Sequence, residues 1–168
     1  VLRIAENHRF SENSKTCKRY DRYNNMVAGG SRMIASVAAI NVWIVKAMAE
    51  YNPILTAYNL AFDLDKCNNT GINFGDFSNQ QFCLWHAAVA KWGFSKKYLN
   101  FMLETSSFNN VTKHKNFSYK TNAEVMTRFV TNQPMLEDEP HTALEDVLYY
   151  ELPILNALVK NTKKSVYM

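Results

Sequence analysis

Residues 54–71, ILTAYNLAFDLDKCNNTG, decide the fold class that the sequence predicts. The first part, 54–59, is a short run with β-branched and aromatic side chains, which is typical of a buried strand. The second part, 60–71, predicts a short helix or turn that is closed by Asn68–Asn69 and Gly71. A strand that leads directly into a helix is the building unit of an α/β protein.

Outside this stretch the sequence alternates between helical and extended patterns. Apolar residues at three- and four-residue spacing predict a helix over 33–48, which could begin near Gly29–Ser31 and stops at Asn52–Pro53. A second strand is expected at 81–85. The other expected elements are a helix over 86–104 with an interruption at Gly93, a hairpin or extended loop over 105–121, a helix from a capping box at Thr121–Glu124 to about Thr131, and a helix over 139–155 that Pro153 kinks or breaks.

Composition and charge describe a globular chain without selecting one function. With 47% hydrophobic and 20% charged residues, the 168-residue chain predicts one domain with a substantial core. The formal charge of +4 is compatible with a polyanionic partner but does not require one. No apolar run is long enough for a membrane span, so no membrane partner is expected. The expected organisation is an N-terminal arm or loop over 1–24, with room for a short helix, a main domain over 25–160, and a tail over 161–168.

The three cysteines do not form a disulfide framework, because their number is odd and their spacing is irregular. A reducing compartment is therefore expected. Cys83 and His86 have a C-x-x-H spacing that could bind zinc in an interaction domain. Without a second paired motif, a buried thiol and a histidine at a helix start are the favoured interpretation.

Acidic residues lie at the ends of predicted strands or helices in two places. Asp63 follows the strand that ends at Asn59, and ligands usually bind at the carboxyl edge of an α/β sheet. His141 and Asp146 lie near the start of the last predicted helix. Carboxylates bind Mg²⁺ or Mn²⁺, and a neutral histidine can deprotonate water, so the set fits metal-assisted hydrolysis. Taken singly, Asp63 could be a helix cap and His141 a surface residue, while Thr142 and Glu145 form a capping pair.

Two motifs, N-x-x-F-D at 59–63 and H-x-A-x-x-D at 141–146, resemble the second and third motifs of the DnaQ-like exonucleases. These are the DEDDh branch of the ribonuclease-H-like 3′–5′ exonucleases, and phage-encoded members are especially similar over 24–158. The resemblance implies a ribonuclease-H-like α/β fold and hydrolysis of phosphodiester bonds, in DNA more than in RNA, with two divalent ions, Mg²⁺ or Mn²⁺. It also implies roles for five residues: Asp63 and Asp146 as metal ligands, His141 as general base, and Asn59 and Phe62 as residues that shape the site.

The first motif of that family, a D-x-E on the first strand, is not found in these 168 residues. We therefore expect the fold to lack its N-terminal strands and the isolated chain to be inactive or nearly so. A missing segment or a second chain would supply the D-x-E strand. The alternative is an inactive relative that binds nucleic acid or a protein partner.

A basic and aromatic segment, KHKNFSYK at 113–120, could hold the substrate of such an enzyme, a single-stranded 3′ end. A solvated surface hairpin is the ordinary alternative. The expected location is the cytoplasm, that of the host if the chain is phage-encoded. The candidate nucleic-acid-binding residues are Lys113, Lys115, Phe117, Tyr119 and Lys120.

Overall fold

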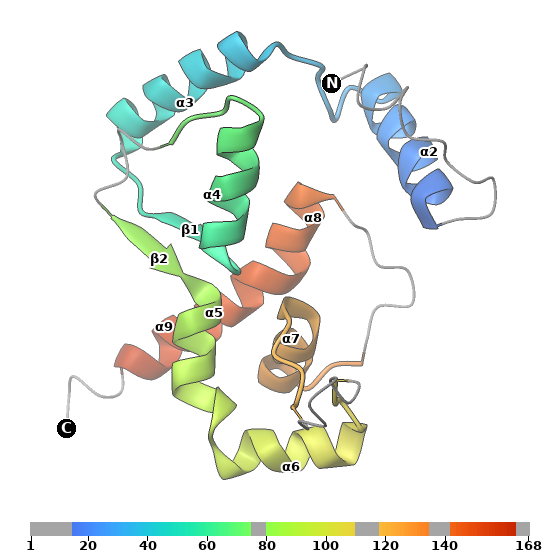
Figure 1. Ribbon diagram of the computed structural model, residues 1–168, viewed down its shortest axis with the longest axis vertical. Helices are drawn as coiled ribbons and strands as arrows, with labels where there is room; N and C mark the ends of the chain where they lie inside the picture. Colours follow the sequence, from blue (N-terminus) through green and yellow to red (C-terminus); the bar gives the residue numbers. More distant parts are fainter. Residues whose placement is uncertain (1–14, 75–79, 110–117, 135–141, 164–168) are drawn as a thin grey trace. The chain divides into compact units, whose positions relative to one another are not determined.

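Strand β1 (Leu55–Ala57) and strand β2 (Gln81–Cys83) pair in parallel in a computed structural model of the chain, with Leu55 opposite Gln81 and Ala57 opposite Cys83. The structure describes residues 15–74, 80–109, 118–134 and 142–163 (Figure 1). Both strands were predicted. The end of the second one was not, because Leu84 and Trp85 already belong to a helix. The described residues form a mixed α/β structure, as predicted, and most of them are helical.

The chain divides into two units, Val1–Glu50 and Tyr51–Met168, and the second contains both strands. Helix α4 follows β1 directly, which confirms the predicted strand–helix unit. Gly93 ends a π-helical turn, so the predicted interruption is also confirmed. The helical elements of this unit are α4 (Leu60–Asn69), α5 (Leu84–Ala88), η1 (Val89–Gly93), α6 (Lys96–Thr105), α7 (Ala123–Thr131), α8 (Ala143–Asp146), η2 (Val147–Glu151) and α9 (Leu152–Lys163).

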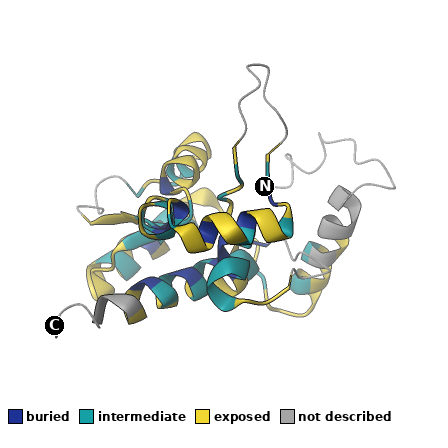
Figure 2. Ribbon diagram, turned by 90° about the horizontal axis from the view of Figure 1, so that it is seen from below, coloured by how far each residue is buried: buried dark blue, intermediate teal, exposed yellow. Residues whose placement is uncertain are grey.

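The core of the second unit lies between four helices. Its buried residues come in pairs from α5, α6, α7 and α9, and Figure 2 colours them dark blue. Aromatic rings extend this core, because Tyr98 packs edge-on against Phe129 at a centroid distance of 4.8 Å. The core residues are Leu84, Ala88, Tyr98, Met102, Val125, Met126, Ile154 and Leu158.

The last helix contains a π-helical turn, η2, which ends two residues before Pro153. The backbone N–H of Leu152 donates to the carbonyl of Val147, which is five residues earlier. The buried hydroxyl of Thr127 donates to the carbonyl of Tyr150 at 3.0 Å and so satisfies a backbone group of this turn. The helical chain therefore continues past Pro153, and the predicted disturbance takes the form of a π turn.

The start of this helix confirms the predicted capping pair. Thr142 is its N-cap residue, and the Thr142 hydroxyl oxygen accepts a hydrogen bond from the backbone N–H of Glu145 at 3.3 Å. The capping box predicted at Thr121 is wrong, because the N-cap of α7 is Asn122. The Thr121 hydroxyl instead accepts a hydrogen bond from the Trp85 indole at 3.1 Å.

The first unit contains helix α2 (Lys15–Ala28) and helix α3 (Val37–Tyr51), whose last residue belongs to the second unit. The predicted arm therefore includes helical structure, and α2 continues past residue 24. Gly30, with φ of 70°, lies in the turn after α2 rather than at the start of α3. Ser36 precedes α3, and its hydroxyl oxygen accepts a hydrogen bond from the N–H of Ala39 at 3.2 Å. No helix in the described part of the chain is long and apolar enough to cross a membrane.

Candidate functional site

The turn between β1 and α4 determines where Asp63 lies. Asn59 is the N-cap residue of α4 and adopts the left-handed conformation, with φ of 67°. Asparagine tolerates this conformation better than most residues. Its carbonyl accepts a hydrogen bond from the N–H of Phe62 at 2.9 Å, which closes the first turn of the helix. Asp63 follows on that first turn, so the direction of the turn fixes the position of its carboxylate.

Glu151 connects this turn to the last helix. The backbone N–H of Tyr58 donates a 2.9 Å hydrogen bond to Oε1 of Glu151, although the two residues are 93 positions apart in the sequence. Burial is the main cause that raises the pKa of Glu151, while the Tyr58 N–H lowers it. The charges of Asp63 and Asp146 raise the pKa of Glu151 further. The pKa of one half-buried carboxylate is therefore sensitive to the charges of both predicted aspartates.

The two predicted residues on α4 are open to solvent. Asp63 is exposed as a residue, yet the protein around its carboxyl group raises the pKa of that group by desolvation. Phe62 keeps 55% of its surface exposed, and the Lys66 ammonium lies 5.0 Å from the centre of its ring. An exposed ring on the first turn of α4 is compatible with the predicted site-shaping role of Phe62. His141, the predicted general base, lies outside the described residues.

The sequence analysis did not select Glu151. In an α-helix, a residue five positions after Asp146 would face about 140° away from it. The π turn changes this relation, since its backbone hydrogen bonds join residues five positions apart. Asp146 precedes the turn and Glu151 ends it, which explains why their charges interact. Pro153 was the one sequence signal for the π turn, because proline removes a backbone hydrogen bond of the preceding helical turn.

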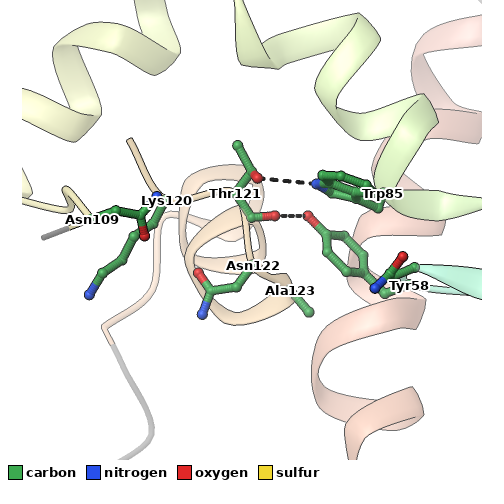
Figure 3. Close-up of a pocket in the computed structure, with 8 residues that line it drawn as sticks. Tyr58, Trp85, Asn109, Lys120, Thr121, Asn122 and Ala123 are labelled. Atoms are coloured by element: carbon green, nitrogen blue, oxygen red, sulfur yellow. Dashed lines mark hydrogen bonds between the residues drawn. The ribbon is translucent and has the colours of Figure 1, made fainter. Parts of the chain in front are cut away.

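A pocket of about 490 Å³ is lined by Tyr58 and Asn59, the two residues between β1 and α4, among others (Figure 3). In Figure 3, Tyr58 and Trp85 lie at one end of the pocket and Lys120 lies at the other. The Tyr58 hydroxyl donates to the carbonyl of Thr121, a residue that also accepts the Trp85 indole N–H. The full lining is Tyr58, Asn59, Trp85, Asn109, Lys120, Thr121, Asn122 and Ala123.

The pocket combines aromatic rings with amide and ammonium groups. The amides of Asn59 and Asn122 form no capping hydrogen bond at their helices. Lys120 is exposed, and its backbone N–H donates to the carbonyl of Ser107. Aromatic rings, amides and a cation are the groups that proteins use to contact unpaired bases and phosphates. The sequence analysis predicted Lys120 here but not Trp85 or Asn122.

The predicted hairpin is present at its base. Phe108 and Tyr119 form an antiparallel bridge, and the N–H of Asn109 donates to the carbonyl of Ser118 at 2.9 Å. Tyr119 is half-buried, and its ring packs edge-on against Tyr98 at 5.9 Å. Its ring therefore contributes to the core. The other three predicted contact residues, Lys113, Lys115 and Phe117, lie outside the described residues.

Comparison with known proteins does not assign a family. No protein-family model, no curated protein and no solved structure matches the chain. The function therefore has to be inferred from the site itself.

The carboxylates of the site have the right chemistry to bind a hard divalent cation, but they are too few to form a complete set of ligands. Carboxylate oxygens are the ligands that Mg²⁺ and Mn²⁺ prefer. Within residues 15–74, 80–109, 118–134 and 142–163, no group of three or more His, Cys, Asp or Glu side chains is arranged to hold a metal ion. This finding also gives no support to zinc at Cys83 and His86. Asp63 and Asp146 could thus provide part of a ligand set.

Proposed function

We propose that the chain is a metal-dependent 3′–5′ exonuclease with a ribonuclease-H-like fold, or the larger part of one, acting on DNA rather than RNA. One observation carries the proposal. Asp63 follows a parallel strand and Asp146 begins the last helix, yet the charges of both reach Glu151. An acid from each of the two motifs that suggested a nuclease therefore influences Glu151, which supports the proposal.

Each residue has a distinct task in this proposal. Asp63 and Asp146 would hold divalent cations, and His141 would accept the proton of the attacking water. Bound Mg²⁺ or Mn²⁺ would neutralise charge on the attacking and leaving oxygens of the phosphodiester. Asn59 would hold Asp63 in place through the left-handed turn. Phe62 would offer an exposed ring beside the reacting phosphate.

The carboxylates of the first motif would come from outside these residues, on another segment or a second chain. Two aspartates alone carry too little negative charge to hold two divalent ions. The sheet, which has two three-residue strands among the described residues, would also gain stability from further strands. The exonuclease proposal therefore includes a partner strand that carries D-x-E.

The pocket beside the acids supports a single-stranded substrate. Tyr58 and Asn59 belong both to the pocket and to the turn that positions Asp63. A strand whose terminal phosphodiester lies at the carboxylates could place a neighbouring base in this pocket. Lys120 would then face the phosphate backbone from the far side.

Mn²⁺ titration of the chain tests the metal site. We expect Mn²⁺ at about millimolar concentration to broaden the NMR signals of both Asp63 and Asp146, because few ligands give weak binding. Asp63→Asn and Asp146→Asn should each abolish the broadening at both positions. Glu104→Gln, which removes an exposed acid on α6, is the matched control and should change nothing. Broadening that is absent at the two aspartates, or that persists when they are replaced, would contradict the proposal.

Replacing Lys113, Lys115 and Lys120 together with glutamine tests the basic segment. We expect weaker binding of single-stranded DNA, and a salt dependence that is flatter by about 0.7 per lost phosphate contact. Fluorescence anisotropy at several salt concentrations measures both quantities. Lys160→Gln, near the end of α9, is the control. An unchanged salt slope would exclude the segment from the DNA contact.

A second candidate is an inactive relative that binds nucleic acid or a protein partner. It is favoured by the finding that the described residues contain no complete group of metal ligands. The two candidates differ in how Mn²⁺ affects DNA binding. An inactive nucleic-acid-binding relative would bind DNA with the same affinity whether or not Mn²⁺ is present.

A further inference from the structure

The turn that carries Asp63 is bonded to a distant helix. Tyr58 is the first residue after β1, and its backbone N–H donates to the side chain of Glu151 on η2. The hydroxyl of the same Tyr58 donates to the carbonyl of Thr121, just before α7. The residue therefore has hydrogen bonds to two other parts of the unit, one from its backbone and one from its ring.

The conformation of the next residue makes this bond important. Asn59 has a positive φ of 67°, which a residue with a side chain adopts at some cost in free energy. Such a conformation persists when surrounding contacts hold the chain on both sides. On the N-terminal side of Asn59, the hydrogen bond to Glu151 holds Tyr58. On the C-terminal side, the N–H of Phe62 donates to the Asn59 carbonyl. The bond to Glu151 thus acts at the point where the chain turns into α4.

We infer that Glu151 is a positioning residue, which fixes the Asp63-bearing turn against the helix that carries Asp146 through its hydrogen bond to the Tyr58 N–H. This inference rests on the proposed function for its consequence, the shared metal site. The hydrogen bond and the geometry of the turn are structural observations that do not depend on that function. Neither the motifs nor their resemblance assigned a role to Glu151.

A different role would follow if the negative charge of Glu151 were what mattered. Glu151 would then act as an additional ligand or as an electrostatic neighbour of the aspartates. Two conservative variants separate the roles. Glu151→Gln keeps the length of the side chain and an acceptor oxygen but removes the charge. Glu151→Asp keeps the charge but shortens the side chain by one methylene, so the oxygen no longer reaches Tyr58 in the same geometry.

The experiment compares the two variants by NMR in the 168-residue chain. Hydrogen exchange of the Tyr58 amide reports the bond, and residual dipolar couplings of α4 relative to α9 report the position of the turn. We expect Glu151→Gln to match the unmodified chain in both. We expect Glu151→Asp to speed exchange at Tyr58 by about tenfold, because the shorter side chain lengthens or breaks the hydrogen bond to the Tyr58 N–H. The couplings of α4 should shift in the same variant, while Glu104→Asp and Glu104→Gln leave them unchanged.

Mn²⁺ broadening in the same samples keeps the two proposals apart. Simultaneous broadening at Asp63 and Asp146 should persist in Glu151→Gln and become unequal in Glu151→Asp. Expected couplings and exchange without any Mn²⁺ effect would support the positioning role and contradict the metal site. The positioning role is overturned if Glu151→Asp behaves like the unmodified chain, or if Glu151→Gln shows the larger change.

Discussion

Replacing Tyr98 with alanine is expected to destabilise the second unit by about 3–5 kcal/mol, the usual cost of removing a large aromatic side chain from a core. Tyr98 is fully buried, with 0% of its surface exposed. Its ring packs against Phe129 and Tyr119, and its hydroxyl donates to the carbonyl of Lys120 at 2.7 Å. The substitution would leave a cavity between α6 and α7 and an unsatisfied carbonyl at the base of the hairpin. Urea unfolding followed by far-ultraviolet circular dichroism measures the loss.

Two control variants separate the contributions to this loss. Tyr98→Phe keeps the ring and removes only the hydroxyl, so it should cost about 1 kcal/mol. Leu103→Ala changes the same helix at a position that keeps 66% of its surface exposed, and should cost about 0.5 kcal/mol or less. A Tyr98→Ala chain as stable as the Leu103→Ala chain would show that Tyr98 is not at the centre of the core.

The structure places Tyr98 at the point where the core meets the site. Its hydroxyl bonds to Lys120, a lining residue of the pocket, and its ring packs against Tyr119 of the hairpin base. The same aromatic content that fits stacking on a ligand is therefore used, in part, to support the pocket from behind.

Local patterns predicted the elements whose causes are local. The strand at 54–59 and the helix after it depend on side-chain type and turn residues, and Gly93 interrupts the helical pattern by itself. The capping pair at Thr142 and Glu145 was predictable for the same reason, because its two members are neighbours on one turn. The carboxyl-edge position of Asp63 followed from the strand–helix order.

Features that depend on distant partners could not be predicted in this way. Thr121 matches a capping box, but its hydroxyl bonds to Trp85 because the folded chain brings α5 near the start of α7. The π turn depends on Pro153 and on the hydroxyl of Thr127, which comes from another helix. Glu151 acquires its place only through that turn. Helical periodicity assumes uniform geometry, and it fails where the geometry changes.

Adding a strand that carries the D-x-E motif is expected to convert an inactive chain into an active Mg²⁺-dependent exonuclease. The physical reason is charge, because two further carboxylates would complete the ligand set that Asp63 and Asp146 begin. The test joins or mixes the chain with a polypeptide that forms a β-strand and carries D-x-E. Stepwise shortening of single-stranded DNA labelled at its 5′ end measures the activity.

Variants of the two aspartates decide whether that activity belongs to this chain. Metal ligation contributes several kcal/mol to stabilising the transition state, so Asp63→Asn and Asp146→Asn should each lower the rate by about 10²–10³-fold. Glu104→Gln removes an equal charge far from the site in sequence and should keep the full rate. Mg²⁺-dependent activity of the 168 residues alone would show that the site is complete without D-x-E. Failure of every D-x-E strand to activate the chain would favour an inactive nucleic-acid-binding relative, in which the aspartates persist without catalysis.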